Sequence, residues 1–282
     1  MHGDTISRFR ISGAALAIAG LWLAVPVGAQ SVLLRLHPRV GDTLYTRLEQ
    51  VTEVSGTIRG VTSPALKPVT TSVALHSRTI VQSSLSDGTV VLTIVDSAAI
   101  TTSDAHAASQ ASDAQRSLVG QRLLLHLASD GTVEKVEDAR GGMASRAVAA
   151  SMSAMPAVFP RRAVTIGEQW TRVMPLPAGG PLGARGSGHV RAVFRLDSIE
   201  RAGNAAYVSM RGEIVPDSSV QGVHLSGTVT GAMQVDRARG WMTDSRFIVL
   251  VQSLVTPPPA TGIAPMRIVT RVTQRLSTMD KR

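Results

Sequence analysis

The chain has 282 residues and no cysteine, with 44% hydrophobic, 17% charged and 3% aromatic residues. This composition excludes a disulfide-stabilised scaffold and a disordered chain, and it is typical of an ordinary soluble fold. Lysine and arginine exceed the acidic residues by 29 to 20, which gives a formal charge of +9. A nucleic-acid partner is nevertheless disfavoured, because single-stranded nucleic acid stacks on aromatic side chains and the chain has only four Phe, three Trp and two Tyr.

The amino terminus has the parts of a secretory signal peptide. Two arginines precede an apolar run over residues 11–25, and small residues lead up to Ala29. A run of about 15 apolar residues is shorter than the roughly 20 that a membrane-spanning helix needs, so a cleaved leader fits better than an anchor. We therefore expect residues 1–29 to be a signal peptide and residues 30–282 to form a single mainly-β domain that is exported, to the periplasm or outside the cell.

Beyond the leader the dominant sequence period is two residues. In the segment 190–196, apolar residues alternate with Arg191 and Arg195, as in a half-buried strand. Similar alternation runs through residues 223–235 and 266–276. A sheet with one hydrated face is typically antiparallel. The sequence therefore predicts a mainly β fold built on an antiparallel sheet.

Turn signals separate the predicted strands as a meander requires. They are the pairs Asp87-Gly88, Asp130-Gly131, Gly203-Asn204 and Arg239-Gly240. Helical signals are fewer: Asp104 precedes an alanine-rich stretch that reaches Leu118, and residues 143–155 contain helix-forming alanine and methionine. The sequence thus predicts one or two short helices beside the sheet. A loop is predicted over residues 59–71, which contain two prolines.

The chain also contains a short internal repeat. Residues 40–47 and residues 166–172 both begin with an aliphatic residue, a glycine and an acid, and both end with an aromatic residue, Thr and Arg. Each segment is followed by a similar series of hairpin signals. We expect the two segments to open duplicated halves, residues 30–160 and 161–282, although two coincidental strand starts would give the same short match.

Three short motifs carry a resemblance to a known family. They are Phe159-Pro160, the segment Ile166-Gly167-Glu168-Gln169-Trp170, and the late hairpin that includes Gly227 to Val235 and Arg239-Gly240-Trp241. Together they resemble a bacterial secreted family of unknown function, similar in layout to the half-barrel envelope carriers of the LolA and LppX type. The resemblance implies a strongly curved antiparallel sheet, a half-barrel, whose concave face is covered by helices and sometimes leaves an apolar cavity for acyl chains. The chain lacks the lipidated cysteine of the lipoprotein members.

The motifs of common catalytic sites are absent from the sequence. There is no cysteine nucleophile, no Gly-x-Ser-x-Gly elbow, no His-Glu-x-x-His and no phosphate-binding glycine loop. Asp96 ends an apolar strand as in aspartic proteases, but Ala98 replaces the glycine that their turn requires. The histidines after the leader lack the spacing of metal ligands: His37, His76, His106, His126, His189 and His224. We therefore predict no enzymatic activity, no catalytic residue, and no metal or cofactor.

Two acidic clusters are the remaining candidates for chemistry. Glu134, Glu137 and Asp138 follow a turn, and Glu49 and Glu53 can face the same way on a strand. Paired carboxylates serve acid-base catalysis, but pairs exposed on a β-face more often keep that face hydrated. We expect both clusters to be solvated surface residues.

The leading hypothesis is a non-enzymatic envelope or secreted binding protein that holds an apolar or lipid-like ligand in the curved sheet. The residues expected to contact the ligand are apolar and lie in the late strands: Val223, Leu225, Met233, Phe247, Ile268 and Val272. The arginines of the last strand are expected to dock weakly to an anionic membrane surface: Arg267, Arg271 and Arg275. The alternative is a structural or protein-interaction module of the envelope without a ligand cavity, and an enzyme assembled only in space is a third hypothesis.

The predicted processing can be measured directly. Because cleavage is expected after Ala29, intact-mass spectrometry of the exported protein should give a chain that starts at Gln30. Full-length chain recovered in the membrane fraction would contradict this prediction.

Overall fold

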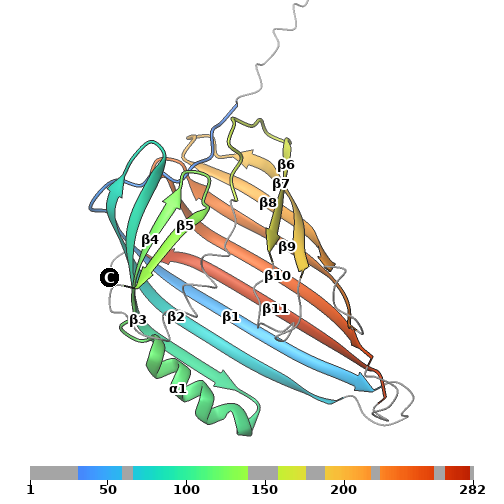
Figure 1. Cartoon of the computed structure of the whole chain (residues 1–282). Helices are drawn as coiled ribbons and strands as arrows, with labels where there is room; N and C mark the ends of the chain where they lie inside the picture. Colours follow the sequence, from blue (N-terminus) through green and yellow to red (C-terminus); the bar gives the residue numbers. More distant parts are fainter. Residues whose placement is uncertain are drawn as a thin grey trace, which may run out of the picture.

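The structure is a computed structural model that describes residues 31–58, 66–138, 158–175, 188–216, 223–256 and 264–279. These residues form one sheet of eleven strands and one short helix (Figure 1). All neighbouring strands are antiparallel. The predicted mainly β fold with an antiparallel sheet is therefore confirmed, whereas the predicted leader lies outside the described residues.

The strands follow one another as a meander in each half of the chain. The first five are β1 Thr43–Ile58, β2 Leu66–Ser84, β3 Gly88–Thr102, β4 Arg122–Ala128 and β5 Val133–Asp138. The other six are β6 Gln169–Pro175, β7 Gly188–Ile199, β8 Ala205–Pro216, β9 Val223–Asp236, β10 Trp241–Val255 and β11 Met266–Met279. Between β3 and β4, the helix α1 (Ala108–Leu118) follows a single 3-10 turn, η1 (Ala105–Ala107).

The order of the strands in the sheet is β5-β4-β3-β2-β1-β11-β10-β9-β8-β7-β6. The first and last strands of the chain therefore pair in the middle of the sheet, from Tyr45 opposite Met279 to Ile58 opposite Met266. The outer strands β5 and β6 do not pair with each other, so the sheet does not close into a barrel. Figure 1 shows the curved sheet with β4, β5 and β6 in front of the long central strands.

The apolar face of the sheet is its concave face. Buried apolar residues form one cluster on β6–β10 and a second cluster on β2–β5. Leu36, which precedes β1, packs against both clusters although they lie on opposite sides of the central strands. One side chain can contact both only because the twisted sheet curls around it. The strong curvature implied by the resemblance is therefore present.

One end of the curved sheet is filled by two segments that cross it. Val32, before β1, and Val164, before β6, form an antiparallel bridge, and Phe159 is buried close to them in the same core. Trp170 in β6 stacks on Phe194 in β7, with ring centroids 5.7 Å apart. This end is a packed core, so only the rest of the concave face is available for a site.

The predicted helix over residues 104–118 is confirmed and lies along the edge of the sheet. The side chain of Asp104 accepts a hydrogen bond from the backbone N–H of His106 and so caps the turn that leads into α1. Gln115 of α1 accepts from the N–H of Ile100, in the part of β3 that extends beyond β4. The helix thus covers a strand edge, unlike the helices over the concave face that the resemblance implied. The other predicted helix, 143–155, lies outside the described residues.

All four predicted hairpins are present, joining β2 to β3, β4 to β5, β7 to β8 and β9 to β10. β2 is longer than expected, because it begins at Leu66, inside the predicted loop 59–71. Pro68 cannot donate to a ladder hydrogen bond. It is tolerated because the β1–β2 register shifts here, between Val54 and Gly56. The loop prediction was therefore wrong for this part of the chain.

The internal repeat corresponds to two equivalent turns. Gly41 and Gly167 have φ angles of 87° and 88°, the left-handed conformation that the third position of a type II turn requires. The carboxylates of Asp42 and Glu168 each accept a hydrogen bond from the backbone N–H three residues earlier. Each glycine N–H donates to the strand that pairs with the strand after the turn. The motif thus has the same local structure before β1 and β6, and duplication of the whole halves remains a prediction.

Asp130 ties the β4–β5 turn to the segment that leads into β6. Its Oδ1 accepts from the N–H and the hydroxyl of Thr132 at 3.1 and 2.7 Å, and its Oδ2 accepts from Nε of Arg161 at 3.0 Å. Its carbonyl accepts from the N–H groups of Val158 and Phe159. Burial acts to raise the pKa of Asp130, but the hydrogen bonds from Thr132 and Arg161 outweigh it and hold this pKa below its ordinary value. The ionised carboxylate therefore stabilises the connection.

Asp130→Asn should lower the free energy of unfolding by about 1–3 kcal/mol at pH 7, because the buried side chain loses its charge-assisted bond to Arg161. The folded pKa of Asp130 lies below the unfolded one, so this stabilisation is present above about pH 4 and is lost as the pH falls through the folded pKa. Urea unfolding at pH 7 and pH 3 measures the difference. Asp87→Asn, exposed in the β2–β3 turn, is the control. An equal loss at both pH values would contradict the ionic contribution.

Candidate functional site

The four central strands, β2, β1, β11 and β10, separate charged from uncharged side chains. The register places the following residues in one row: Thr71, Thr52, Val272, Val249 and Val229. Val229 belongs to the buried core cluster, so this row lies on the concave face. The residues of this face are all uncharged along β1 and β11, from Val69 to Thr79 in β2, and from Ser245 onward in β10.

The opposite, outer face of the same strands carries the charges. They are Arg47, Glu49, Glu53, Arg78, Asp244, Arg246, Arg267, Arg271 and Arg275. Lys67 lies apart from both sets, exposed in the irregular start of β2. Alternation of side chains along a strand accounts for the separation, since successive residues point to opposite faces.

The structure divides the predicted ligand residues between the core and the open part of the concave face. Leu225 and Met233 are buried in the core cluster, with 8% and 3% of their surface exposed. The others with described side chains are half-buried on the same face: Phe247, Ile268 and Val272. Val223 is the first residue of β9, and its side chain lies outside the described part. The half-buried residues are those that a ligand can still contact, and their role remains a prediction.

The concave face contains further half-buried residues that no local pattern assigned to a site. They come from β1, β2 and β11: Leu48, Gln50, Val73, Leu75 and Gln274. Sequence patterns alone do not bring them together, because the pairing of the first strand with the last is not local. One signal was present in β1: Arg47, Glu49 and Glu53 occupy alternate positions, which leaves uncharged residues on the other face.

Phe247 lies across the neighbouring strand because that strand has a glycine at this position. Gly231 in β9 is its cross-strand partner, and a β-carbon at Gly231 would lie 2.2 Å from Cδ1 of Phe247. A glycine covered by a cross-strand aromatic ring is a recognised way to stabilise a sheet. Phe247 therefore stands at the boundary between the packed core and the open part of the concave face.

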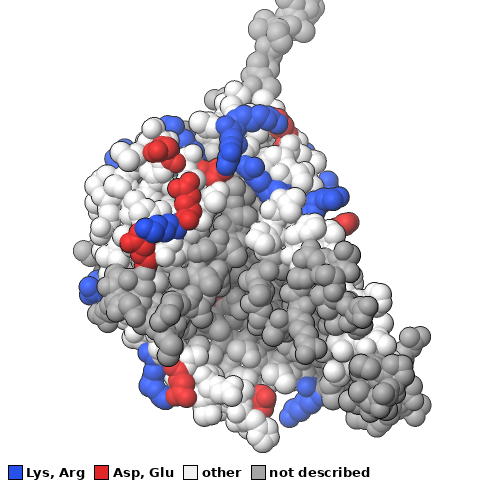
Figure 2. All heavy atoms as spheres, viewed as in Figure 1, with Lys and Arg blue, Asp and Glu red and all other residues white. Residues whose placement is uncertain are grey.

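The three arginines predicted to dock to a membrane lie on the outer face, and two of them face carboxylates. Arg271 is the cross-strand partner of Glu53, and Arg275 is the partner of Glu49. Arg275 also lies 3.9 Å from the carboxylate of Asp244. Opposite charges in such pairs stabilise a sheet modestly. On the opposite side of the molecule, which is the side in view in Figure 2, acidic and basic side chains are also interspersed. Membrane docking remains a prediction that this arrangement does not favour.

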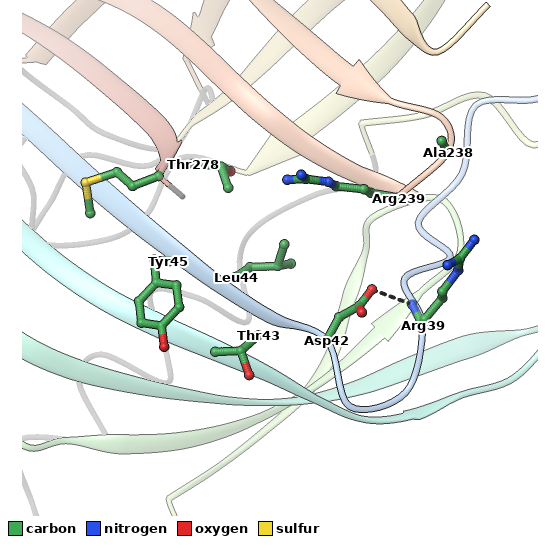
Figure 3. A pocket seen from close by; sticks show the side chains of 9 residues that line it. Arg39, Asp42, Thr43, Leu44, Tyr45, Ala238, Arg239 and Thr278 are labelled. Atoms are coloured by element: carbon green, nitrogen blue, oxygen red, sulfur yellow. Dashed lines mark hydrogen bonds between the residues drawn. The ribbon is translucent and has the colours of Figure 1, made fainter. Parts of the chain in front are cut away.

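Two pockets formed by the described residues have mixed linings. One of about 440 Å³ lies where β1 begins and β11 ends, with Asp42, Tyr45 and Arg239 among its lining residues (Figure 3). Two of its charged side chains have partners: Asp42 accepts from the backbone N–H of Arg39 at 3.2 Å, and Arg239 lies 3.6 Å from Asp236. The other, of about 470 Å³, lies on the outer face of the central strands. Neither is an apolar cavity of the kind that acyl chains occupy.

Acidic side chains singled out in the sequence form ion pairs. Asp96 lies 3.2 Å from Arg78 on the outer face, which accounts for its position at a strand bulge without catalysis. Glu137 contacts Lys135 and His126, and the hydrogen bond from Lys135 lowers the pKa of Glu137. Among the described residues, no three His, Asp or Glu side chains gather so as to hold a metal ion. The same part of the chain contains no helix with the length and hydrophobicity to cross a membrane.

Comparison with known proteins finds a match of part of the chain to a family, but no function. Residues 140–242 match the model of DUF6263, a family of unknown function. A family of unknown function is thus found, as the motifs indicated, over fewer than half of the residues. No curated protein matches the chain.

The solved structures that are similar to the chain include the following two. One is DynF from the dynemicin biosynthesis pathway of Micromonospora chersina, with 9% identity over 89% of this chain and 86% of DynF and a TM-score of 0.24. The other is the outer membrane protein OprG from Pseudomonas aeruginosa, with 7% identity over 87% of this chain and 99% of OprG and a TM-score of 0.20. Both TM-scores are too low to carry an argument about fold or function.

Gly231→Ala should destabilise the protein, because the new methyl group would meet the ring of Phe247 and lie 2.6 Å from the carbonyl oxygen of Arg246. Overpacking of this kind costs about 1–3 kcal/mol. Thr228→Ala, exposed on the outer face of the same strand, should change the free energy of unfolding by less than about 0.5 kcal/mol. Urea unfolding at pH 7 measures both variants. Wild-type stability in Gly231→Ala would show that the contact is not close.

Proposed function

We propose that the protein is a non-enzymatic binding protein of the cell envelope, or a secreted one, that holds an apolar or lipid-like ligand on the concave face of its sheet. The observation that carries the proposal is the uncharged, half-buried concave face of the four central strands. A charge there would lose its hydration under an apolar ligand, whereas each methylene buried against aliphatic side chains contributes about 0.8 kcal/mol.

The open part of this face offers apolar contacts on each central strand. They include Phe247 and Val249 on β10, Val272 and Leu276 on β11, Leu48 on β1, and Val73 and Leu75 on β2. The packed core on β7–β9 bounds this open part of the face, because Leu225 and Met233 are already buried in the core cluster. The ligand therefore lies against the central strands rather than against β7–β9.

The proposed role agrees with the half-barrel carriers of the LolA and LppX type, whose layout the sequence motifs resemble. The curvature of the sheet and its apolar concave face support this likeness. Helical cover of that face is not found among the described residues, so the likeness rests on the sheet alone. Export, which an envelope or secreted role needs, rests on the predicted leader over residues 1–29.

A structural or protein-interaction module of the envelope is the second candidate, and one observation favours it. The two pockets of about 440 and 470 Å³ are lined by polar, charged and apolar side chains together. A ligand carrier is expected to have a mostly apolar pocket, whereas an interaction module needs none. The two candidates differ in whether an apolar molecule binds at micromolar concentration.

Val272→Asp tests the proposal, because it places a carboxylate in the middle of the concave face. Binding is measured with the uncharged dye N-phenyl-1-naphthylamine, whose fluorescence rises in apolar surroundings, and by native mass spectrometry of protein purified from an envelope fraction. We expect the wild-type protein to bind the dye at micromolar concentration. Val272→Asp should bind it at least about tenfold more weakly, which corresponds to about 1.4 kcal/mol.

Val269→Asp is the matched control, since it makes the same substitution on the same strand but on the outer face. It should leave dye binding unchanged. Circular dichroism of both variants checks that the sheet is retained. Wild-type protein that takes up no dye and carries no co-purifying lipid would overturn the proposal and favour the interaction module.

A further inference from the structure

Polarity changes across the concave face from one side of the sheet to the other. On β7, β8 and β9, this face belongs to the apolar core cluster. On β2, β1 and β11, the same face carries amide and hydroxyl side chains among its aliphatic ones: Thr71, Gln50, Thr52, Thr270 and Gln274. The boundary runs along β10, where Phe247 lies over β9. The open part of the face is therefore amphiphilic, although it is uncharged.

Two glutamines lie at the centre of this polar area. Gln50 and Gln274 are direct partners in the β1–β11 ladder, and their Cβ atoms are accordingly about 5 Å apart. Nε2 of Gln50 donates to the hydroxyl of Thr52 at 3.3 Å, and the carboxamide of Gln274 forms no hydrogen bond within the described part of the chain. A carboxamide can make up to about four hydrogen bonds, so most of the capacity of this pair is unused there.

Apolar side chains border the two carboxamides in the register of the sheet. Phe247 and Val73 flank them in the same row. Leu48 and Leu276 form the adjacent row toward the packed end, and Val272 lies in the adjacent row on the other side. A small polar area within an apolar surround is complementary to a molecule with a compact polar group on a hydrocarbon body.

No charged side chain of the described central strands accompanies the two carboxamides. The arginines of β10 and β11 lie on the outer face, and Lys67 is exposed at the irregular start of β2, several rows away. A carboxylate or phosphate bound beside Gln50 and Gln274 would lose its hydration without gaining a counter-charge. A hydroxyl or amide group needs only the hydrogen bonds that carboxamides provide.

We infer that the ligand is an uncharged amphiphile, whose hydroxyl- or amide-bearing headgroup bonds to Gln50 and Gln274 while its hydrocarbon chain lies along Phe247 and Val272. The inference rests on the proposed binding function and narrows its ligand. Monoglycerides, fatty alcohols and fatty amides have this chemistry. Fatty acids and anionic phospholipids do not.

Two ligands with the same hydrocarbon chain distinguish the contribution of the headgroup to binding from that of the chain. They are 1-monooleoylglycerol, which is uncharged, and oleate, whose carboxylate is ionised at pH 8. Each is titrated, below the concentration at which it aggregates, against protein loaded with N-phenyl-1-naphthylamine. We expect 1-monooleoylglycerol to displace the dye at concentrations at least about tenfold lower than oleate.

Substitution of Gln274 tests the position of the headgroup. Gln274→Leu replaces one carboxamide with an apolar side chain of similar size. It should weaken 1-monooleoylglycerol binding about fivefold without changing dye binding. Gln252→Leu removes the same group from the outer face of β10, where it accepts a hydrogen bond from Arg267, and should change neither affinity. Gln274→Lys should shift the preference toward oleate, because it supplies the missing counter-charge.

The outcomes distinguish this inference from the proposed function. If the dye binds but oleate displaces it as well as 1-monooleoylglycerol does, the headgroup inference is overturned and the binding function stands. Unchanged 1-monooleoylglycerol affinity in Gln274→Leu would likewise overturn the inference. If the wild-type protein binds neither the dye nor either lipid, the binding function itself is overturned.

Discussion

The pairing of the first strand with the last is the contact on which the rest of the structure depends. β1 and β11 lie at opposite ends of the described chain, yet they form an uninterrupted ladder of fourteen residue pairs. The entropy cost of closing so long a loop grows only slowly with its length, and a continuous antiparallel ladder offsets it. Without this ladder, β2–β5 and β6–β10 would belong to separate sheets, each with part of a core.

The same ladder determines what each face of the sheet can do. Since side chains alternate along both strands, the register that places Gln50 opposite Gln274 also places Glu49 opposite Arg275. The carboxamides therefore meet on the concave face and the charges meet on the outer face. A shift of one residue in β11 would turn its arginines toward the concave face and expose its aliphatic residues. The uncharged interior and the ion-paired exterior are thus two results of one register.

Features that depend on a few neighbouring residues could be predicted from the sequence. The cap at Asp104, the turn at Asp130 and the alternation in β7 are of this kind, because caps, turn chemistry and side-chain period act locally. The passage of β2 through Pro68 could not be predicted in this way, since a change of register depends on the partner strand. The alternation of apolar and polar residues in the last strand predicted that Ile268 and Val272 lie on the same face of the sheet. The meeting of Gln50 and Gln274, in contrast, required the pairing of distant strands.

The edge strands β5 and β6 cannot form an antiparallel pair with each other, because the sheet has an odd number of strands. Eleven strands are arranged around a curve and the ten adjacent pairs are all antiparallel, so the two strands at the remaining seam run in the same direction. A parallel pair cannot be joined by the short hairpins found elsewhere in the sheet. The sheet is therefore open between its two edge strands, β5 and β6. At this opening, local contacts take the place of a ladder: Asp130 in the β4–β5 turn accepts hydrogen bonds from Arg161, Val158 and Phe159 in the segment that leads into β6.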